Sequence, residues 1–290
     1  MSAHNGQDRV HADDHGRDPG LGQDHHHEEH GHDDIDWDAM AAHLEREAEL
    51  RVPFVEEALA WLRGLMLEGG CGPDTAERVM DLGSGPGVFT VLLARAFPQA
   101  EVVAVDGEPG LLRRVRDRAE REGAASNITV REARFPQELG GLGSADLIWT
   151  SNVVHHIGDQ QAALDSLAAA VRTGGLLAVV ERGLSPRYLP RDIGLGRPGL
   201  LARLEAANEE RYTAMREALP GHTRVVEDWA AMLARAGMAP AGTRTFLTDL
   251  PAPPAVGGAC ASLRQAGPRQ GHAGRMAGPG RRPRTGGPAR

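Results

Sequence analysis

Two aspartates flank a glycine-rich turn whose residue types and spacing suit the binding of a small polar ligand. Asp81 begins the pattern D-x-G-x-G-x-G, which continues through Gly83, Gly85 and Gly87, and Asp106 follows further along the chain. Glycine lets the backbone turn sharply and approach a ligand that a Cβ would keep away. An acidic residue at the end of a strand can accept hydrogen bonds from the hydroxyls of a ribose. The pattern therefore predicts a nucleotide site.

The elements around the turn must bring these groups to one place. Val79–Leu82 is a short apolar run typical of a buried strand, and Val102–Val105 is a second one. Between them, apolar residues recur at helical spacing from Val88 to Ala96. Ligands of open parallel sheets bind at the carboxyl ends of the strands. We therefore expect the glycine turn and Asp106 to meet at one edge of a parallel sheet.

The spacing of the glycines distinguishes between cofactors. A dinucleotide fingerprint, G-x-G-x-x-G, would place its third glycine at position 88, but that residue is Val88 and the glycine is Gly87. The carboxylate of Asp81 would repel a pyrophosphate, whereas it suits an ammonium group. A ligand with a ribose, an amino-acid end and no phosphate fits these residues, and S-adenosylmethionine is such a ligand.

The run DLGSGPG from Asp81 to Gly87, with Asp106 after the second strand, resembles the first two motifs of class I S-adenosylmethionine-dependent methyltransferases. The resemblance covers roughly Trp37 to Leu250. It implies an α/β, Rossmann-like, doubly wound and mostly parallel sheet. It also implies that Asp81 orients the methionine ammonium and that Asp106 holds the ribose. The cofactor-binding residues that it implies are Asp81, Gly83, Ser84, Gly85, Gly87, Asp106, Gly107, Glu132, Ala133, Ser151 and Asn152.

The adenine contacts are expected after the third predicted strand, Asn127–Arg131. The family often has an acid here, near the adenine amino group, and Glu132 takes this place, although its distance to the next proline is shorter than usual. Arg134 or Phe135 could equally lie on the adenine.

Paired histidines follow the fourth predicted strand, Ala145–Thr150. The family members that methylate amide or base nitrogens usually have an N/D-P-P-Y/F motif here, and this chain has Ser151-Asn152-Val153-Val154-His155-His156 instead. The pair resembles the motif of small-molecule C- and O-methyltransferases. A neutral imidazole of His155 or His156 could take a proton from the acceptor. Alternatively, one histidine caps a helix and the other fills space, since proximity alone can drive methyl transfer.

The remaining elements are expected to cover this core. Trp37–Gly69 reads as two helices separated at Pro53, within an N-terminal helical region 35–72. Asp159 can cap the helix after the histidines, Thr173-Gly174-Gly175 would end that helix, and Leu176–Val180 reads as the fifth strand. Residues 184–226 are expected to form a helical substrate cover, in which Arg187, Arg191 and Arg197 either hold an anionic substrate or stay solvated.

The end of the chain departs from the family. Thr243–Leu250 reads as a sixth strand, but no seventh strand follows it, so the predicted methyltransferase domain ends at residue 254. Residues 255–290 are rich in Gly, Arg and Pro and contain no Asp or Glu. We interpret them as a disordered tail, either natural or produced by a frameshift near Pro254. An unpaired strand edge would lower stability, because unpaired buried backbone groups are unfavourable.

Composition narrows the functional classes. The net charge of −8 gives no overall case for nucleic-acid binding. Two cysteines without metal-ligand spacing, no membrane-length apolar run and no secretory signal predict a cytoplasmic protein with no membrane partner. Residues 1–34 are predicted to be a disordered His/Asp-rich tail, whose histidines more plausibly form a solvated tail than a metal site.

The sequence thus predicts a methyltransferase that uses S-adenosylmethionine to methylate an oxygen or a carbon of a small molecule, without a metal ion. The competing hypotheses are a truncated relative without catalysis, a nicotinamide-dependent oxidoreductase, which Val88 disfavours, and a metal-handling protein built on the N-terminal histidines. The acceptor and the oligomeric state stay open.

Overall fold

The computed structural model describes residues 37–181 and 196–250 and, between these ranges, residues 183, 185, 187, 190 and 192–194. The side chains of residues 37–39 are not among those described. The predicted tails, 1–34 and 255–290, and Arg191 of the predicted cover lie outside the described residues.

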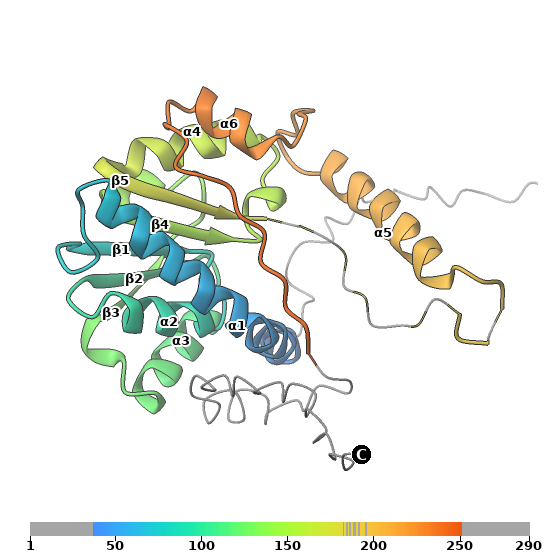
Figure 1. Cartoon of the computed structure of the whole chain (residues 1–290), viewed down its shortest axis with the longest axis horizontal. Helices are drawn as coiled ribbons and strands as arrows, with labels where there is room; N and C mark the ends of the chain where they lie inside the picture. The colour runs from blue at the N-terminus through green and yellow to red at the C-terminus, as the bar shows by residue number, and fades with distance from the viewer. Residues whose placement is uncertain are drawn as a thin grey trace, which may run out of the picture. The chain divides into compact units, whose positions relative to one another are not determined.

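Five parallel strands form the central sheet: β1 (Arg78–Leu82), β2 (Glu101–Asp106), β3 (Ile128–Glu132), β4 (Ala145–Ser151) and β5 (Val171–Val180). Their spatial order is β3-β2-β1-β4-β5, and every neighbouring pair is parallel (Figure 1). The order reverses at β1, which is where ligands bind in open α/β sheets. This topology confirms the predicted Rossmann-like, doubly wound fold.

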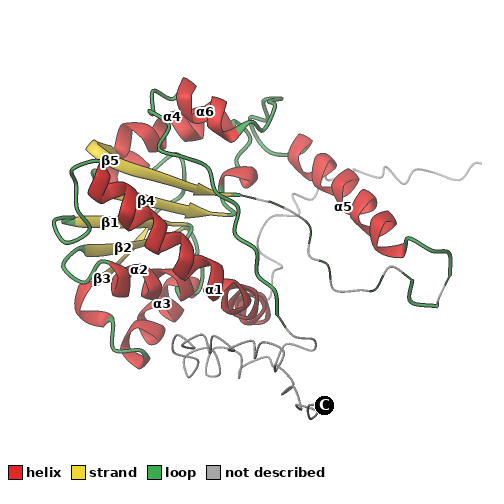
Figure 2. Ribbon diagram, viewed as in Figure 1, coloured by secondary structure: helices red, strands yellow, loops and turns green. Residues whose placement is uncertain are grey.

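The helices of the described chain are α1 (Trp37–Glu68), α2 (Val88–Ala96), α3 (Pro109–Arg121), α4 (Gln160–Ala170), α5 (Leu200–Glu217) and α6 (Trp229–Arg235), with 3-10 turns η2 (Ala125–Asn127), η3 (Leu139–Leu142) and η4 (Val154–His156). α1, α2 and α3 pack on one face of the sheet and α4 and α6 on the other, whereas α5 lies away from the sheet (Figure 1). Alternate strand residues point to these opposite faces. Val79 belongs to an apolar cluster with α1 and α2, whereas Met80 belongs to a second cluster with α4 and α6. Figure 2 shows α4 and α6 side by side, away from α1.

The prediction of two N-terminal helices is wrong, because α1 continues through Pro53 as one 32-residue helix. The helix changes direction along its length (Figure 1), as an internal proline allows. Contacts on both sides of Pro53 hold α1 together. After it, Val55, Ala58 and Leu59 are buried in a cluster with α2, and before it Glu45 pairs with Arg114 of α3 (Nη1 to Oε1, 3.6 Å). No helix in the described part of the chain is long and apolar enough to cross a membrane.

Two boundaries near the end of the sheet also differ from the predictions. α4 ends at Ala170 and β5 already begins at Val171, so residues 173–175 do not end the helix but lie in an irregularity of the β4–β5 pairing, where Gly174 has a φ of +81°. Thr243–Leu250 is not a strand in the structure. Phe246 of this segment instead packs on Phe54 and Trp61 of α1, with ring centroids 6.4 and 6.2 Å away.

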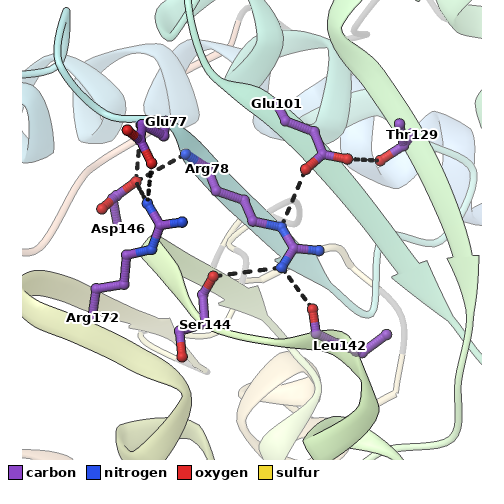
Figure 3. A network of polar contacts seen from close by, with 8 residues as sticks. All are labelled: Glu77, Arg78, Glu101, Thr129, Leu142, Ser144, Asp146 and Arg172. Atoms are coloured by element: carbon purple, nitrogen blue, oxygen red, sulfur yellow. Dashed lines mark hydrogen bonds and ion pairs between the residues drawn. The ribbon is translucent and has the colours of Figure 1, made fainter.

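A polar network ties the strands together at the amino-terminal edge of the sheet (Figure 3). Asp146 of β4 is buried, and its Oδ2 accepts hydrogen bonds at 2.9 Å from the backbone N–H of Glu77, from that of Arg78 and from the Arg172 guanidinium of β5. Arg78 in turn donates to the carbonyl of Leu142 at 2.6 Å. One carboxylate thus joins the starts of three adjacent strands.

Removing this carboxylate should destabilise the fold. We predict that Asp146→Ala lowers the free energy of unfolding by about 1 to 3 kcal/mol, because two part-buried backbone N–H groups lose their acceptor and the Arg172 guanidinium keeps only Glu77. Asp146→Asn should lose less, since its amide oxygen can still accept a hydrogen bond. Urea denaturation of both variants checks this, with Asp117→Ala, on the exposed face of α3, as the control expected within about 0.5 kcal/mol of the original chain. An unchanged midpoint for Asp146→Ala would contradict the assignment.

Candidate functional site

The glycine turn after β1 lies at the carboxyl edge of the sheet and is held by the end of β2. The backbone N–H groups of Gly83 and Ser84 donate to the carbonyl of Val105 at 2.8 and 2.9 Å. Gly83 has a φ of +73°, and a Cβ on it would lie 2.2 Å from Cγ2 of Val153, so no other residue fits there.

The other two glycines of the motif have different surroundings. Gly87 has a φ of +83°, and its Cβ would lie 2.9 Å from Cα of Val115 in α3. A Cβ on Gly85 would meet no atom within 4 Å, so this glycine faces open space. The hydroxyl of Ser84 is buried and has no hydrogen-bond partner among the residues that the structure describes. The turn is therefore closely packed at Gly83 and Gly87 but open at Gly85, and its Ser84 hydroxyl is left without a hydrogen-bond partner among the described residues.

Asp106 ends β2 beside this turn. Its Oδ2 accepts a hydrogen bond from the backbone N–H of Gly85 at 2.9 Å, and its Oδ1 accepts one from that of Glu108 at 3.0 Å. Burial raises the pKa of Asp106, and the backbone N–H donors from Gly85 and Glu108 oppose this rise. A carboxylate has about four lone-pair sites, so it can still accept the two hydroxyls of a ribose.

Asp81 lies before the turn and is almost completely buried, with 2% of its surface exposed. Its Oδ2 accepts a hydrogen bond from the Thr90 hydroxyl of α2 at 2.6 Å. Burial raises the pKa of Asp81 to about 7; the Thr90 hydrogen bond opposes this rise and the nearby charge of Asp106 adds to it. A cation bound at Asp81 would favour its ionised form.

The residues predicted for the adenine side lie at the ends of β2 and β3. Glu132 is exposed and stands opposite Asp106 in the register of these strands. The N–H of Ala133 donates to the carbonyl of Asp106 at 3.1 Å, and a Cβ on Gly107 would lie 3.6 Å from Cγ of Arg134. The structure therefore brings Gly107, Glu132 and Ala133 to the same edge as the turn.

Ser151 and Asn152 are half-buried at the end of β4. Asn152 adopts a left-handed conformation with a φ of +57°, its N–H donates to the carbonyl of Val180 at 2.9 Å, and its amide donates to the Ser151 hydroxyl at 3.2 Å. A strained non-glycine residue of this kind is typical of a functional site.

The two predicted histidines follow in η4 and differ in their surroundings. His155 is buried, and its Nδ1 lies 2.6 Å from Oε2 of Glu181, the residue after β5. His156 is exposed, and its ring packs against that of His155 with the centroids 4.1 Å apart and the ring planes tilted by 45°. Partial burial, the charge of His155 and that of Arg216 lower the pKa of His156, while Glu181 opposes them, so His156 favours the neutral form.

Sequence reasoning assigned no role to three residues that surround these histidines. They are Glu181, Tyr212 of α5, whose ring centroid is 5.9 Å from that of His155, and Arg216 of α5, which donates to the carbonyls of His155 and Ile157 at 2.6 and 2.8 Å. An acid directly after an apolar strand was the available signal for Glu181, by analogy with Asp106. The position of α5 had no comparable signal.

These residues fit S-adenosylmethionine. The buried carboxylate of Asp81 can pair with an ammonium group, and the carboxylate of Asp106 can accept hydrogen bonds from a ribose. Gly85, whose open side could admit the ligand, lies between them in the chain. Within the described ranges, no group of three or more His, Cys, Asp or Glu residues could hold a metal ion.

The chain is similar to known methyltransferases. Residues 79–175 match the family model of the methyltransferase domain. Trans-aconitate 2-methyltransferase from Azoarcus sp. (strain BH72) is 31% identical over 181 residues, which are 62% of this chain and 57% of that protein. The enzyme of the same name from Variovorax paradoxus (strain S110) is 35% identical over 104 residues, or 36% and 38% of the two chains.

Among solved structures, an O-methyltransferase family protein from Burkholderia thailandensis is 19% identical, with a TM-score of 0.49 over 72% of this chain and 57% of that one. The chain spans between 24% and 57% of the length of the curated relatives that it matches here. The matched model shows the methyltransferase domain over residues 79–175, and the glycine turn with its two acids is similar to that of the class I S-adenosylmethionine-dependent family.

Proposed function

We propose that this chain transfers the methyl group of S-adenosylmethionine to an oxygen or a carbon of a small molecule. The observation that carries this proposal is the pair of buried or half-buried carboxylates, Asp81 and Asp106, on either side of a turn whose Gly85 faces open space. When bound, S-adenosylmethionine would supply a methyl group activated by a sulfonium.

The residues of the turn would hold the cofactor. Asp81 would pair with the methionine ammonium, Asp106 would accept the ribose hydroxyls, and Gly85 would let the ligand approach the backbone. The further predicted contacts, Gly107, Glu132, Ala133, Ser151 and Asn152, lie at the ends of the neighbouring strands β2, β3 and β4. Their common position at the carboxyl edge supports the assignment.

The acceptor would lie near η4, where His155 or His156 can take its proton. We assign residues 35–254 to the methyltransferase domain and residues 184–226 to its cover, in which α5 reaches the histidines through Tyr212 and Arg216. The names of the relatives support a small-molecule acceptor, since several are trans-aconitate 2-methyltransferases. One further relative, from Laribacter hongkongensis (strain HLHK9), is a malonyl-[acyl-carrier protein] O-methyltransferase.

A truncated relative without catalysis is the second candidate. This candidate is favoured because residues 243–250, which the sequence predicts as a sixth strand, are not part of the sheet. A folded chain that fails to bind the cofactor product would support this candidate.

The cofactor site can be tested by calorimetric titration with S-adenosylhomocysteine, the product form of the cofactor. We expect saturable binding, and a loss of roughly tenfold or more in affinity for Asp106→Ala and Asp106→Asn, because a ribose hydroxyl loses its charged acceptor. Asp117→Ala should bind like the original chain. Thermal melting of each variant shows whether lost binding reflects lost folding. Folded Asp106 variants that bind S-adenosylhomocysteine as tightly as the original chain would refute the role of Asp106.

The raised pKa of Asp81 predicts two opposite pH dependences. Between the ordinary carboxyl pKa of 3.8 and the folded value of about 7, the folded chain keeps a proton that the unfolded chain has lost. The contribution of Asp81 to stability is therefore lost as pH rises through this window. Cofactor binding should strengthen as pH rises from 6 to 8, because only ionised Asp81 pairs with an ammonium.

The variant Asp81→Asn isolates both effects. Its stability should vary less with pH than that of the original chain in denaturant titrations between pH 4 and 8. Its affinity for S-adenosylhomocysteine should be lower at pH 8 and nearly constant between pH 6 and 8. Parallel pH profiles for the two proteins would show that Asp81 does not titrate in this range.

A further inference from the structure

We propose that Glu181 is a positioning residue that holds His155 in the tautomer whose Nε2 can accept a proton, which makes His155, and not His156, the base of the site. The tautomer is inferred from the contacts of an ionised Glu181, whereas the use of the base rests on the proposed methyl transfer.

The contacts of Glu181 define its role. Its Oε2 lies 2.6 Å from Nδ1 of His155, and its Oε1 accepts hydrogen bonds from the backbone N–H groups of Val153 and Val154 at 3.2 and 2.9 Å. The Glu181 side chain is 3% exposed and that of His155 is 11% exposed. An ionised carboxylate only accepts hydrogen bonds, so Nδ1 must carry the hydrogen. In a neutral ring this leaves the lone pair on Nε2.

The backbone of His155 is fixed as well as its ring. Arg216 of α5 is buried and donates to the carbonyls of His155 and Ile157, with that of Gly158 at 3.5 Å. Glu227 lies 4.0 Å from Nε of the same guanidinium. The charged and titratable groups around the ring are therefore Glu181 beyond β5, Arg216 and Tyr212 on α5, Glu227 before α6, and His156.

The segment that carries His155 packs against the glycine turn. Val153, two residues before His155, is the residue whose Cγ2 a Cβ on Gly83 would meet at 2.2 Å. The same residue's N–H donates to Glu181. One short segment thus contacts both the turn that would hold the methyl donor and the carboxylate that orients the histidine.

A base of this kind suits an acceptor that must lose a proton as it is methylated. The O–H bond of such an acceptor breaks, its proton goes to Nε2 of His155, and the oxygen electron pair bonds the methyl carbon while the carbon–sulfur pair returns to sulfur. Glu181 then faces the imidazolium that forms and stabilises it. A carboxylate acceptor is already ionised at neutral pH and needs no base.

His156 fits this role less well. Its ring is exposed, and no carboxylate accepts a hydrogen bond from it in the described part of the chain. Nothing comparable to Glu181 selects one of its two neutral tautomers.

Nitrogen–proton correlation NMR of the histidine rings tests the proposal directly. In the full chain at a pH where the ring is neutral, we expect His155 to show hydrogen on Nδ1 and a bare Nε2, with and without S-adenosylhomocysteine. Glu181→Gln, which keeps the size but removes the charge, should shift His155 towards the tautomer with hydrogen on Nε2. His155→Gln assigns the signal among the 13 histidines of the chain. Glu217→Gln, exposed on α5, is the matched control and should change nothing.

The outcomes separate this inference from the proposed function. A His155 ring with hydrogen on Nε2 in the original chain would overturn it, and so would a folded Glu181→Gln variant with an unchanged tautomer. If the Glu181→Gln variant does not fold, the tautomer of His155 measured in the original chain decides whether the proposal holds. Failure to bind S-adenosylhomocysteine would instead count against the methyltransferase proposal. Binding retained by Glu181→Gln with a shifted tautomer is the result that we expect.

Discussion

The close approach of the chain at Gly83 and Gly87 is the constraint on which the rest of the site depends. At both positions a Cβ would lie within 3 Å of a neighbouring residue, Val153 after β4 and Val115 in α3. The two backbone N–H groups that reach the carbonyl of Val105 add a third contact, to β2. The turn is therefore fixed to three elements at once, and the open side of Gly85 stays free of contacts within 4 Å.

The two edges of the sheet use acidic residues in opposite ways. At the amino-terminal edge, Asp146 is paired with the Arg172 guanidinium and with two backbone N–H groups, and the network joins neighbouring strands (Figure 3). At the carboxyl edge, Asp81 is buried beside a hydroxyl, and its pKa rises to about 7 because of that burial. A buried acid without a cation is unfavourable for stability, and such perturbed groups gather at functional sites.

The histidine site depends on contacts between distant parts of the chain. His155 and Glu181 are 26 positions apart, and Arg216 lies 61 positions after His155, on a helix that follows the whole core pattern. β4 and β5 are adjacent in the sheet, so the residues that follow them lie close together. The pairing of a histidine with a carboxylate is therefore a consequence of strand order, and α5 adds to it from outside the sheet.

The local pattern of the sequence determined the strand-turn-helix around Asp81, the acid at Asp106 and the cap at Asp159, which accepts the N–H of Ala162 at 2.9 Å. These features need only neighbouring residues, so their signals are local. Tertiary contacts decided the rest. Contacts on both sides of Pro53 keep α1 continuous, and the segment 243–250 is not a strand, because strand pairing requires a neighbouring strand as well as a suitable sequence. Glu181 became the partner of His155 only when parallel pairing brought the ends of β4 and β5 together, since a contact across the sheet leaves no periodicity in the sequence.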